Sequence, residues 1–156
     1  MVASQLNRIE RTTLIRAPRS RVWSALTGVR EFCQWFRAET AAPDFQPGAR
    51  VRLISTHPGP CEKAEFFVDI VEMVPEQRFS WRWHPGAPVP GEDLSDEPMT
   101  LVEFVLEDAE GGTRVTVTES GFDRIFANRQ SRVFKENEEG WQYQMAALER
   151  YLSEPA

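Results

Sequence analysis

The chain has 156 residues, a formal net charge of −6 and a hydrophobic fraction of 41%. This length and apolar content predict a single domain over residues 1–156 and exclude a disordered chain, a collagen-like chain and a disulfide scaffold. The negative charge opposes binding to nucleic acid and to anionic membranes, because both require a positive field.

The sequence also indicates a cytoplasmic location. Residues 1–8 lack the apolar segment of a secretory signal, and no apolar run approaches the ~18 residues of a membrane span. Cys33 and Cys61 form no Cys-x-x-Cys motif, which favours reduced thiols over a structural disulfide.

The first half of the chain predicts one strand, two short helices and then further strands. Residues 9–15 are rich in Thr and Ile, which favours a strand. Ser20 is the expected N-cap of the first helix, which Gly28 ends, and residues 30–35 form the second helix. Alternating apolar residues predict strands at residues 50–56, 63–74 and 77–83.

The second half predicts a hairpin and one long helix. Residues 85–98 form a loop rich in Pro, Gly and acidic residues, which we expect to be mobile and able to cover a cavity. Residues 100–106 and 114–119 form the hairpin. A stripe at 4-3-4-3-4 spacing predicts a helix over residues 131–152: Phe134, Glu138, Trp141, Met145, Leu148 and Leu152.

These elements together predict an α+β fold with an internal pocket. The long amphipathic helix must bury its stripe, and the concave face of the antiparallel sheet is the only large apolar partner. Because a curved sheet wrapped on a helix rarely fills its centre, we expect a cavity between them.

Several short motifs resemble the SRPBCC (START-like, helix-grip) superfamily, in the branch of the heat-shock-protein-90 ATPase activator homologues. The resemblance covers nearly the whole chain. It rests on the order and spacing of the following motifs: Ile15 to Pro18 followed by Val22-Trp23 and Leu26, Trp35, Pro47-Gly48, Val74-Pro75 with Phe79-Ser80-Trp81, Gly112-Thr113, and Glu119 to Phe122 with Gly140-Trp141. It implies a β-α-α-β6-α helix grip around a mostly apolar cavity, and it implies no single ligand.

Large aromatic and apolar residues are the candidate pocket lining. Each of them could instead be ordinary core, but together they are bulky enough to surround a ligand site. The candidates are Trp35, Phe66, Phe79, Trp81, Trp83, Phe104, Val117, Phe122, Phe126, Trp141 and Met145.

Glu119 and Glu138 are the candidate polar groups of this cavity. Strand parity points Glu119 inward with Val117, and the helix stripe includes Glu138. Two carboxyls in an apolar cavity could orient a ligand or act as acid and base. The alternative is that the strand ends before Glu119 and that Glu138 lies in solvent.

We expect no metal and no cofactor. His57, Cys61 and Glu62 are close in sequence but lie around a Pro-Gly-Pro turn and fall short of four protein ligands. Neither a GxGxxG nor a GxxxxGK[ST] motif is present.

Three functions remain open, and the favoured one is binding of a small or medium hydrophobic molecule between sheet and helix. The second is a polyketide cyclase or dehydratase-like enzyme that uses the cavity carboxylates. The third is a chaperone-associated regulatory protein, which rests on the resemblance alone. A homodimer through an edge strand is compatible with each of them.

Overall fold

A computed structural model describes residues 7–59, 62–87 and 89–153. Its elements follow the order strand, two helices, six strands and one long helix. They are β1 (Arg8–Ile15), α2 (Arg19–Thr27), α3 (Val29–Phe36), β2 (Ala38–Glu39), β3 (Arg50–Ser55), β4 (Glu65–Val74), β5 (Arg78–Trp83), β6 (Thr100–Ala109), β7 (Gly112–Ser120), the 3-10 turn η1 (Phe122–Arg124) and α4 (Ala127–Ser153).

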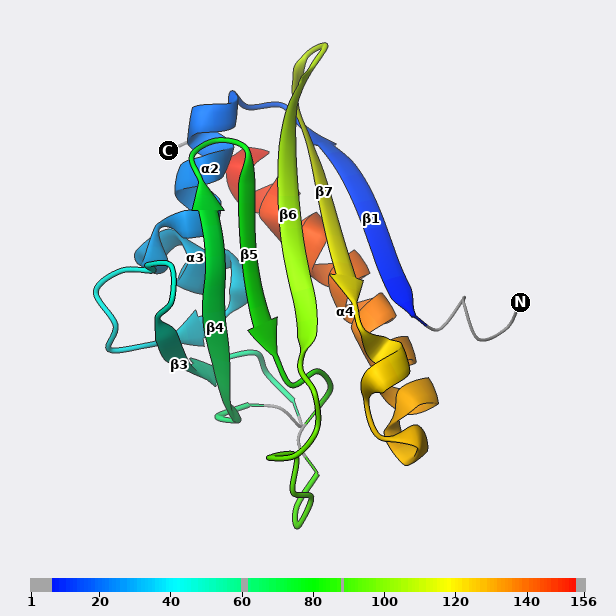
Figure 1. The fold of residues 1–156 in the computed structure, drawn as a ribbon. Helices are drawn as coiled ribbons and strands as arrows, with labels where there is room; N and C mark the ends of the chain where they lie inside the picture. The colour runs from blue at the N-terminus through cyan, green and yellow to red at the C-terminus, as the bar shows by residue number, and fades with distance from the viewer. Residues whose placement is uncertain (1–6, 60–61, 88, 154–156) are drawn as a thin grey trace.

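The strands form one antiparallel sheet of seven strands in the order β1-β7-β6-β5-β4-β3-β2. The sheet curves in front of α4, which crosses its concave face diagonally, and α2 and α3 lie on the same side at one end (Figure 1). This arrangement confirms the predicted α+β helix grip. Among the described residues, no helix is apolar and long enough to cross a membrane.

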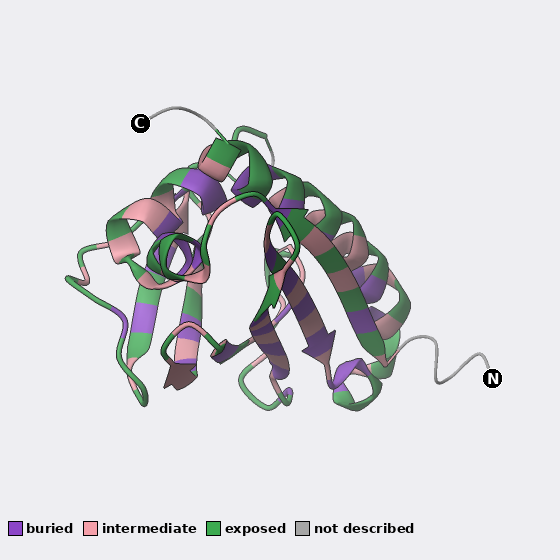
Figure 2. Cartoon of the chain, turned by 90° about the horizontal axis from the view of Figure 1, so that it is seen from above, coloured by how far each residue is buried: buried purple, intermediate pink, exposed green. Residues whose placement is uncertain are grey.

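Alternation along the strands sends large aromatics into the space between sheet and helix. On β5, Phe79 and Trp81 are 0% and 1% exposed, while Arg82 between Trp81 and Trp83 is exposed. Phe79 lies opposite Phe104 of β6 in the sheet register. Buried residues recur along the strands and along α4, as the purple bands in Figure 2 show.

The long helix begins earlier than its apolar stripe suggests. It starts at Ala127, four residues before the predicted position, because the side chain of Gln130 donates hydrogen bonds to the carbonyl oxygens of Asp123 and Ile125 and anchors the first turn. Of the stripe, Phe134, Trp141, Met145 and Leu148 are buried.

Two further details differ from the sequence prediction. Pro18 holds the N-cap position of α2 and Ser20 lies inside the helix, where its carbonyl accepts the Ser24 hydroxyl. Strands β6 and β7 are longer than predicted, and a turn of only two residues joins them. There Gly112 passes so close to β1 that a Cβ would meet the carbonyl oxygen of Ile15 at 2.0 Å.

Candidate ligand-binding pocket

A pocket of about 400 Å³ lies beside α4, where β3 and β5 end and β4 begins. Its walls come from five parts of the fold: the end of α3, strands β3 to β5, the turn before β4, the loop after β5, and the middle of α4. The lining residues are Phe36, Ser55, Ala64, Glu65, Phe66, Trp83, His84, Gly86, Ala87, Glu136, Asn137 and Glu139. A recess of about 110 Å³ adjoins it and adds Gly140, Trp141 and Gln144.

Three aromatic rings form the apolar wall. The ring centroids of Phe36, Phe66 and Trp83 lie 6.1 to 6.4 Å apart, so each ring contacts the other two. Phe66 and Trp83 are half-buried, which leaves part of each ring facing the pocket. Rigid aromatic faces of this kind are typical of sites that bind apolar molecules.

Glu119 lies behind this wall and is fully buried. Its Oε2 accepts Trp83 Nε1 at 2.8 Å and the Thr100 hydroxyl at 2.5 Å. Its Oε1 accepts Asn137 Nδ2 and Trp141 Nε1, both at 2.8 Å. A carboxylate offers about four acceptor positions, and here all are used. Glu119 therefore fixes two pocket tryptophans and does not itself line the pocket.

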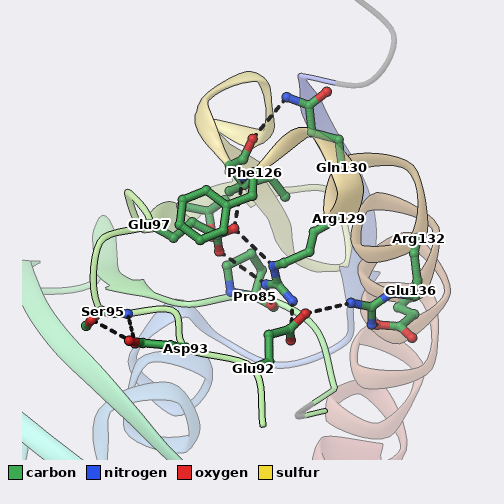
Figure 3. A network of polar contacts seen from close by, with 12 residues as sticks. Pro85, Glu92, Asp93, Ser95, Glu97, Phe126, Arg129, Gln130, Arg132 and Glu136 are labelled. Carbon is green, nitrogen blue, oxygen red and sulfur yellow. Dashed lines mark hydrogen bonds and ion pairs between the residues drawn. The ribbon is translucent and has the colours of Figure 1, made fainter. Parts of the chain in front are cut away.

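A buried ion pair holds the loop that closes one side of the pocket. Arg129 is 1% exposed and contacts Glu97 through two hydrogen bonds of 3.0 and 3.2 Å (Figure 3). It also donates to Glu92 at 3.0 Å and to the carbonyl oxygen of Pro85 at 2.9 Å. Glu97 in turn accepts the backbone amide of Phe126 at 2.9 Å. The loop that we expected to be mobile is therefore tied to the first turn of α4.

The loop meets α4 at Gly86 and Ala87. A Cβ on Gly86, whose φ is +93°, would come within 2.9 Å of a methyl group of Val133, so this close approach requires glycine. The amide of Ala87 donates to Glu136 Oε1 at 3.2 Å. These contacts set the position of the pocket wall.

His84 is the titratable group of this wall. It is half-buried, and its Nδ1 is buried with no hydrogen-bond partner among the described residues. Burial lowers the pKa of His84, and the nearby Arg129 and Arg50 guanidinium groups lower it further, against the opposing effect of Glu97 and Asp69. The imidazole is therefore neutral at pH 7.

Of the predicted lining residues, the structure brings Phe66 and Trp83 to the pocket and Trp141 to its recess. Most of the others pack in the core between the sheet and the helices, and Phe122 packs against Phe134 of α4. Those core residues are Trp35, Phe79, Trp81, Phe104, Val117, Phe122 and Met145. The indole of Trp35 donates to the carbonyl oxygen of Ala25 at 2.8 Å. Phe126 is half-buried in the turn before α4.

The predicted inward orientation of Glu138 is wrong. Its side chain is 45% exposed and lies 3.9 Å from Arg11 of β1. The 4-3 spacing from Phe134 to Trp141 fits an inward residue at position 137 as well as at 138, and the structure places Asn137 inward. Glu138 lies outside the pocket, and the acceptor positions of Glu119 are all used by hydrogen bonds. The two carboxyls are therefore not arranged as an acid–base pair in the pocket.

Sequence reasoning missed most of the polar lining and Phe36. Phe36 follows Trp35, and its ring faces the pocket because α3 ends there. Asn137 lies one turn before Trp141, so helical spacing could have identified it. No local pattern points to Ala64, Gly86 or Ala87, because the loops that carry them are placed by distant contacts.

His57, His84 and Cys33 belong to no group of side chains arranged to hold a metal ion among the described residues. Within residues 7–59, 62–87 and 89–153, no group of three or more His, Cys, Asp or Glu side chains is placed to hold a metal ion. His57 packs edge-on against Tyr143, with ring centroids 5.1 Å apart. Burial raises the pKa of the Cys33 thiol, and Glu39 adds to this rise. Cys61 lies outside the described residues.

Comparisons with known proteins agree with this architecture. Solved structures of similar fold include DynU16, described as a protein in the dynemicin biosynthetic locus, with 25% identity and a TM-score of 0.70 over 94% of this chain. This chain spans 47% of DynU16, about half of its length. A search of the curated proteins finds no match.

Two other solved structures match over most of both chains. A protein from Arthrobacter aurescens shares 20% identity at a TM-score of 0.77, covering 97% of this chain and 89% of its own. The Aha1 dimer from Colwellia psychrerythraea shares 17% identity at a TM-score of 0.68, covering 93% and 95%. At these identities the likeness shows the fold.

The family model described as "Activator of Hsp90 ATPase homolog 1-like protein" matches residues 16–153. The match begins directly after β1 and runs through both short helices, the remaining strands of the sheet and α4. The chain therefore belongs to the family of activator of Hsp90 ATPase homologue 1-like proteins, within the helix-grip fold.

Proposed function

We propose that this protein binds a small or medium apolar molecule in the pocket between β3–β5 and α4. The observation that carries the proposal is the triangle of Phe36, Phe66 and Trp83 around a space of about 400 Å³. Ligand pockets are typically about 300–1,000 Å³ with mainly apolar walls and a few polar groups.

The surrounding contacts support a preformed site. Glu119 holds Trp83 and Trp141 by hydrogen bonds, and Arg129 holds the loop that carries Gly86 and Ala87. A wall that is already ordered loses little conformational entropy on binding. Tight binding therefore does not require a large rearrangement.

A thermal-shift screen tests the proposal. The panel contains fatty acids, sterols, flavonoids and polyketide-like aromatics, measured with the parent chain, with Ala64→Phe and with Ala146→Phe. Ala64 lines the pocket, so a phenyl ring there fills it, whereas Ala146 is exposed on α4. A ligand at ~100 times its Kd stabilises the fold by about 2.7 kcal/mol, which raises Tm by several degrees.

The expected result is a shift that Ala64→Phe removes and Ala146→Phe retains. A panel without any shift, or a shift that survives Ala64→Phe, contradicts binding in this pocket.

Regulation of a chaperone is a second candidate, and the family match over residues 16–153 favours it. Purified Hsp90 and this chain are mixed, and ATP hydrolysis and complex formation are measured. A rise in ATPase rate on addition of the chain supports the role, whereas an unchanged rate without a complex contradicts it.

Self-association is the partner proposal that the Aha1 dimer from Colwellia psychrerythraea supports. In the described sheet, β1 is an edge strand of eight residues that pairs with β7 on one side. Size-exclusion chromatography with light scattering should give a mass twice that of the 17.9 kDa monomer. A monomer at high concentration contradicts it.

A further inference from the structure

The polar groups that line the pocket are mainly hydrogen-bond acceptors. Glu65, Glu136 and Glu139 contribute carboxylates, and no Lys or Arg is among the described residues that line it. A donor-bearing ligand can satisfy such groups, whereas a ligand carboxylate would lie among like charges.

The three carboxylates differ in how far they are already paired. Glu65 pairs with Arg52, and Glu136 accepts the Ala87 amide and lies 3.7 Å from Arg132. Glu139 is exposed at the rim and forms no ion pair within the described part of the chain. Arg52 and Arg132 are thus already paired with carboxylates, and Glu139 is the lining carboxylate for which the described residues offer no ion pair.

Asn137 adds a directed acceptor. Glu119 can only accept hydrogen bonds, so the amide nitrogen of Asn137 must face it at 2.8 Å. The carbonyl oxygen then points the other way. Asn137 lines both the pocket and its recess, and within the described residues this oxygen accepts no hydrogen bond.

The aromatic wall is compatible with a ligand that carries a positively charged hydrogen-bond donor. Trp83 and Phe66 both line the pocket, and aromatic faces attract cations through the ring quadrupole. His84, neutral at pH 7, adds no positive charge that would attract an anion.

From these groups we propose that the pocket takes an apolar molecule with a hydrogen-bond-donating head group, an ammonium in preference to a hydroxyl, and rejects carboxylates. The proposal rests on the proposed function, because it names the ligand class of the same pocket. The apolar body lies against Phe66 and Trp83, and the head group reaches Asn137 Oδ1 and Glu139.

Three probes with one apolar body test the class: 2-(2-naphthyl)ethylamine, 2-(2-naphthyl)ethanol and 2-naphthylacetate. Isothermal titration calorimetry with the whole chain gives each Kd. We expect the amine to bind about tenfold more tightly than the carboxylate, with the alcohol between them. Raising NaCl from about 20 mM to about 500 mM should reduce this difference, because salt screens exposed charges.

Glu139→Gln should lower the preference for the amine to about threefold, because it removes one rim charge while keeping the side-chain shape. Glu149→Gln is the matched control, since Glu149 is exposed further along the same helix and does not line the pocket. It should leave the preference unchanged.

The outcomes separate the two proposals. If the carboxylate binds as tightly as the amine and Ala64→Phe abolishes both, the pocket is a ligand site and the class inference fails. If the amine keeps its full preference in Glu139→Gln, the placement of the head group at Glu139 fails. If none of the probes and none of the screening panel binds, both proposals fail.

Discussion

The space between sheet and α4 has a closed end and an open end, although both are built from the same kinds of residue. At the closed end, Phe32 packs against Trp35 and Trp81, with ring centroids 5.2 and 5.8 Å apart. At the open end, Phe36, Phe66 and Trp83 surround a space of about 400 Å³. What differs is the covering element: α2 and α3 at one end, and a loop at the other.

A loop covers less tightly than a helix because it brings fewer large side chains. The loop after β5 contributes His84, Gly86 and Ala87 to the wall, and two of these carry almost no side chain. It is held by polar contacts with Arg129 and Glu136 and by the close approach of Gly86 to Val133. Aromatic residues therefore form core where a helix faces them and a pocket where this loop does.

The largest effect should come from comparing Phe79→Ala with Phe66→Ala. Phe79 is 0% exposed, so its loss leaves a cavity at the closed end and should cost about 3–5 kcal/mol of unfolding free energy. Phe66 already borders open space, and its loss should cost about 1–2 kcal/mol. Denaturant unfolding of both variants measures the difference, and equal losses would mean that the two ends are packed alike.

Arg129→Met should break the contact that holds the loop. Removing the guanidinium leaves the Glu97 carboxylate buried without its partner, which should cost about 3 kcal/mol. Arg132→Met is the control: Arg132 lies one turn later, is 38% exposed and contacts Glu92 as well, so its loss should cost under ~1 kcal/mol.

A second variant tests the mechanism of the loop contact. Arg129→Met with Glu97→Met replaces the buried pair by apolar groups and should regain much of the lost stability. If the double variant is as unstable as the single one, the cost lies in helix packing and not in an unpaired charge. Faster hydrogen exchange at the Ala87 amide should accompany Arg129→Met alone.

Sequence patterns predicted the fold far better than the site. The alternation on β5 and the stripe on α4 depend on local periodicity, and the structure confirms both elements. The pocket depends on contacts across the chain, such as Arg129 with Glu97, whose positions are 32 residues apart. A charged side chain in the first turn of a helix is usually solvated, so the sequence carries no sign that Arg129 is buried.

The contrast between Glu119 and Glu138 shows the limit of periodicity. Successive side chains of a strand alternate between the two faces of the sheet, and this alternation correctly placed Glu119 inward. On a helix the side-chain direction changes in smaller steps, because one residue along α4 turns the side chain by about 100°. That step separates Asn137, which contacts Glu119, from Glu138, which lies beside Arg11.

Glu119→Gln should have an intermediate effect. One carboxylate oxygen becomes an amide nitrogen, which cannot accept two of the four present hydrogen bonds. Leaving buried donors unpaired costs about 1–3 kcal/mol. Trp83 and Trp141 should lose their fixed positions, so tryptophan fluorescence should shift along with the midpoint of unfolding. Glu103→Gln, on the outer face of β6, is the control, and an equal loss there would mean that Glu119 has no special role.

The smallest effect is a pH dependence at the pocket wall. The folded state lowers the pKa of His84 below its usual 6.5, mainly through burial. Between that lowered pKa and pH 6.5 the unfolded chain binds more protons than the folded chain, so unfolding free energy falls as pH drops through this range. The paired carboxyls Glu31 and Asp69 have pKa values lowered from 4.5 and 3.8, so their contribution is lost only at more acidic pH.

Measuring unfolding free energy at about pH 7.5 and about pH 5.5 therefore isolates the imidazole. The parent chain should lose stability over this interval, and His84→Asn should lose less of it. Ligand affinity should follow the same direction for a cationic probe, because a protonated His84 would add a positive charge to the wall of the pocket that binds the ammonium. If His84→Asn keeps the full pH dependence, another group causes it, and the wall around His84 is more open to water than its burial indicates.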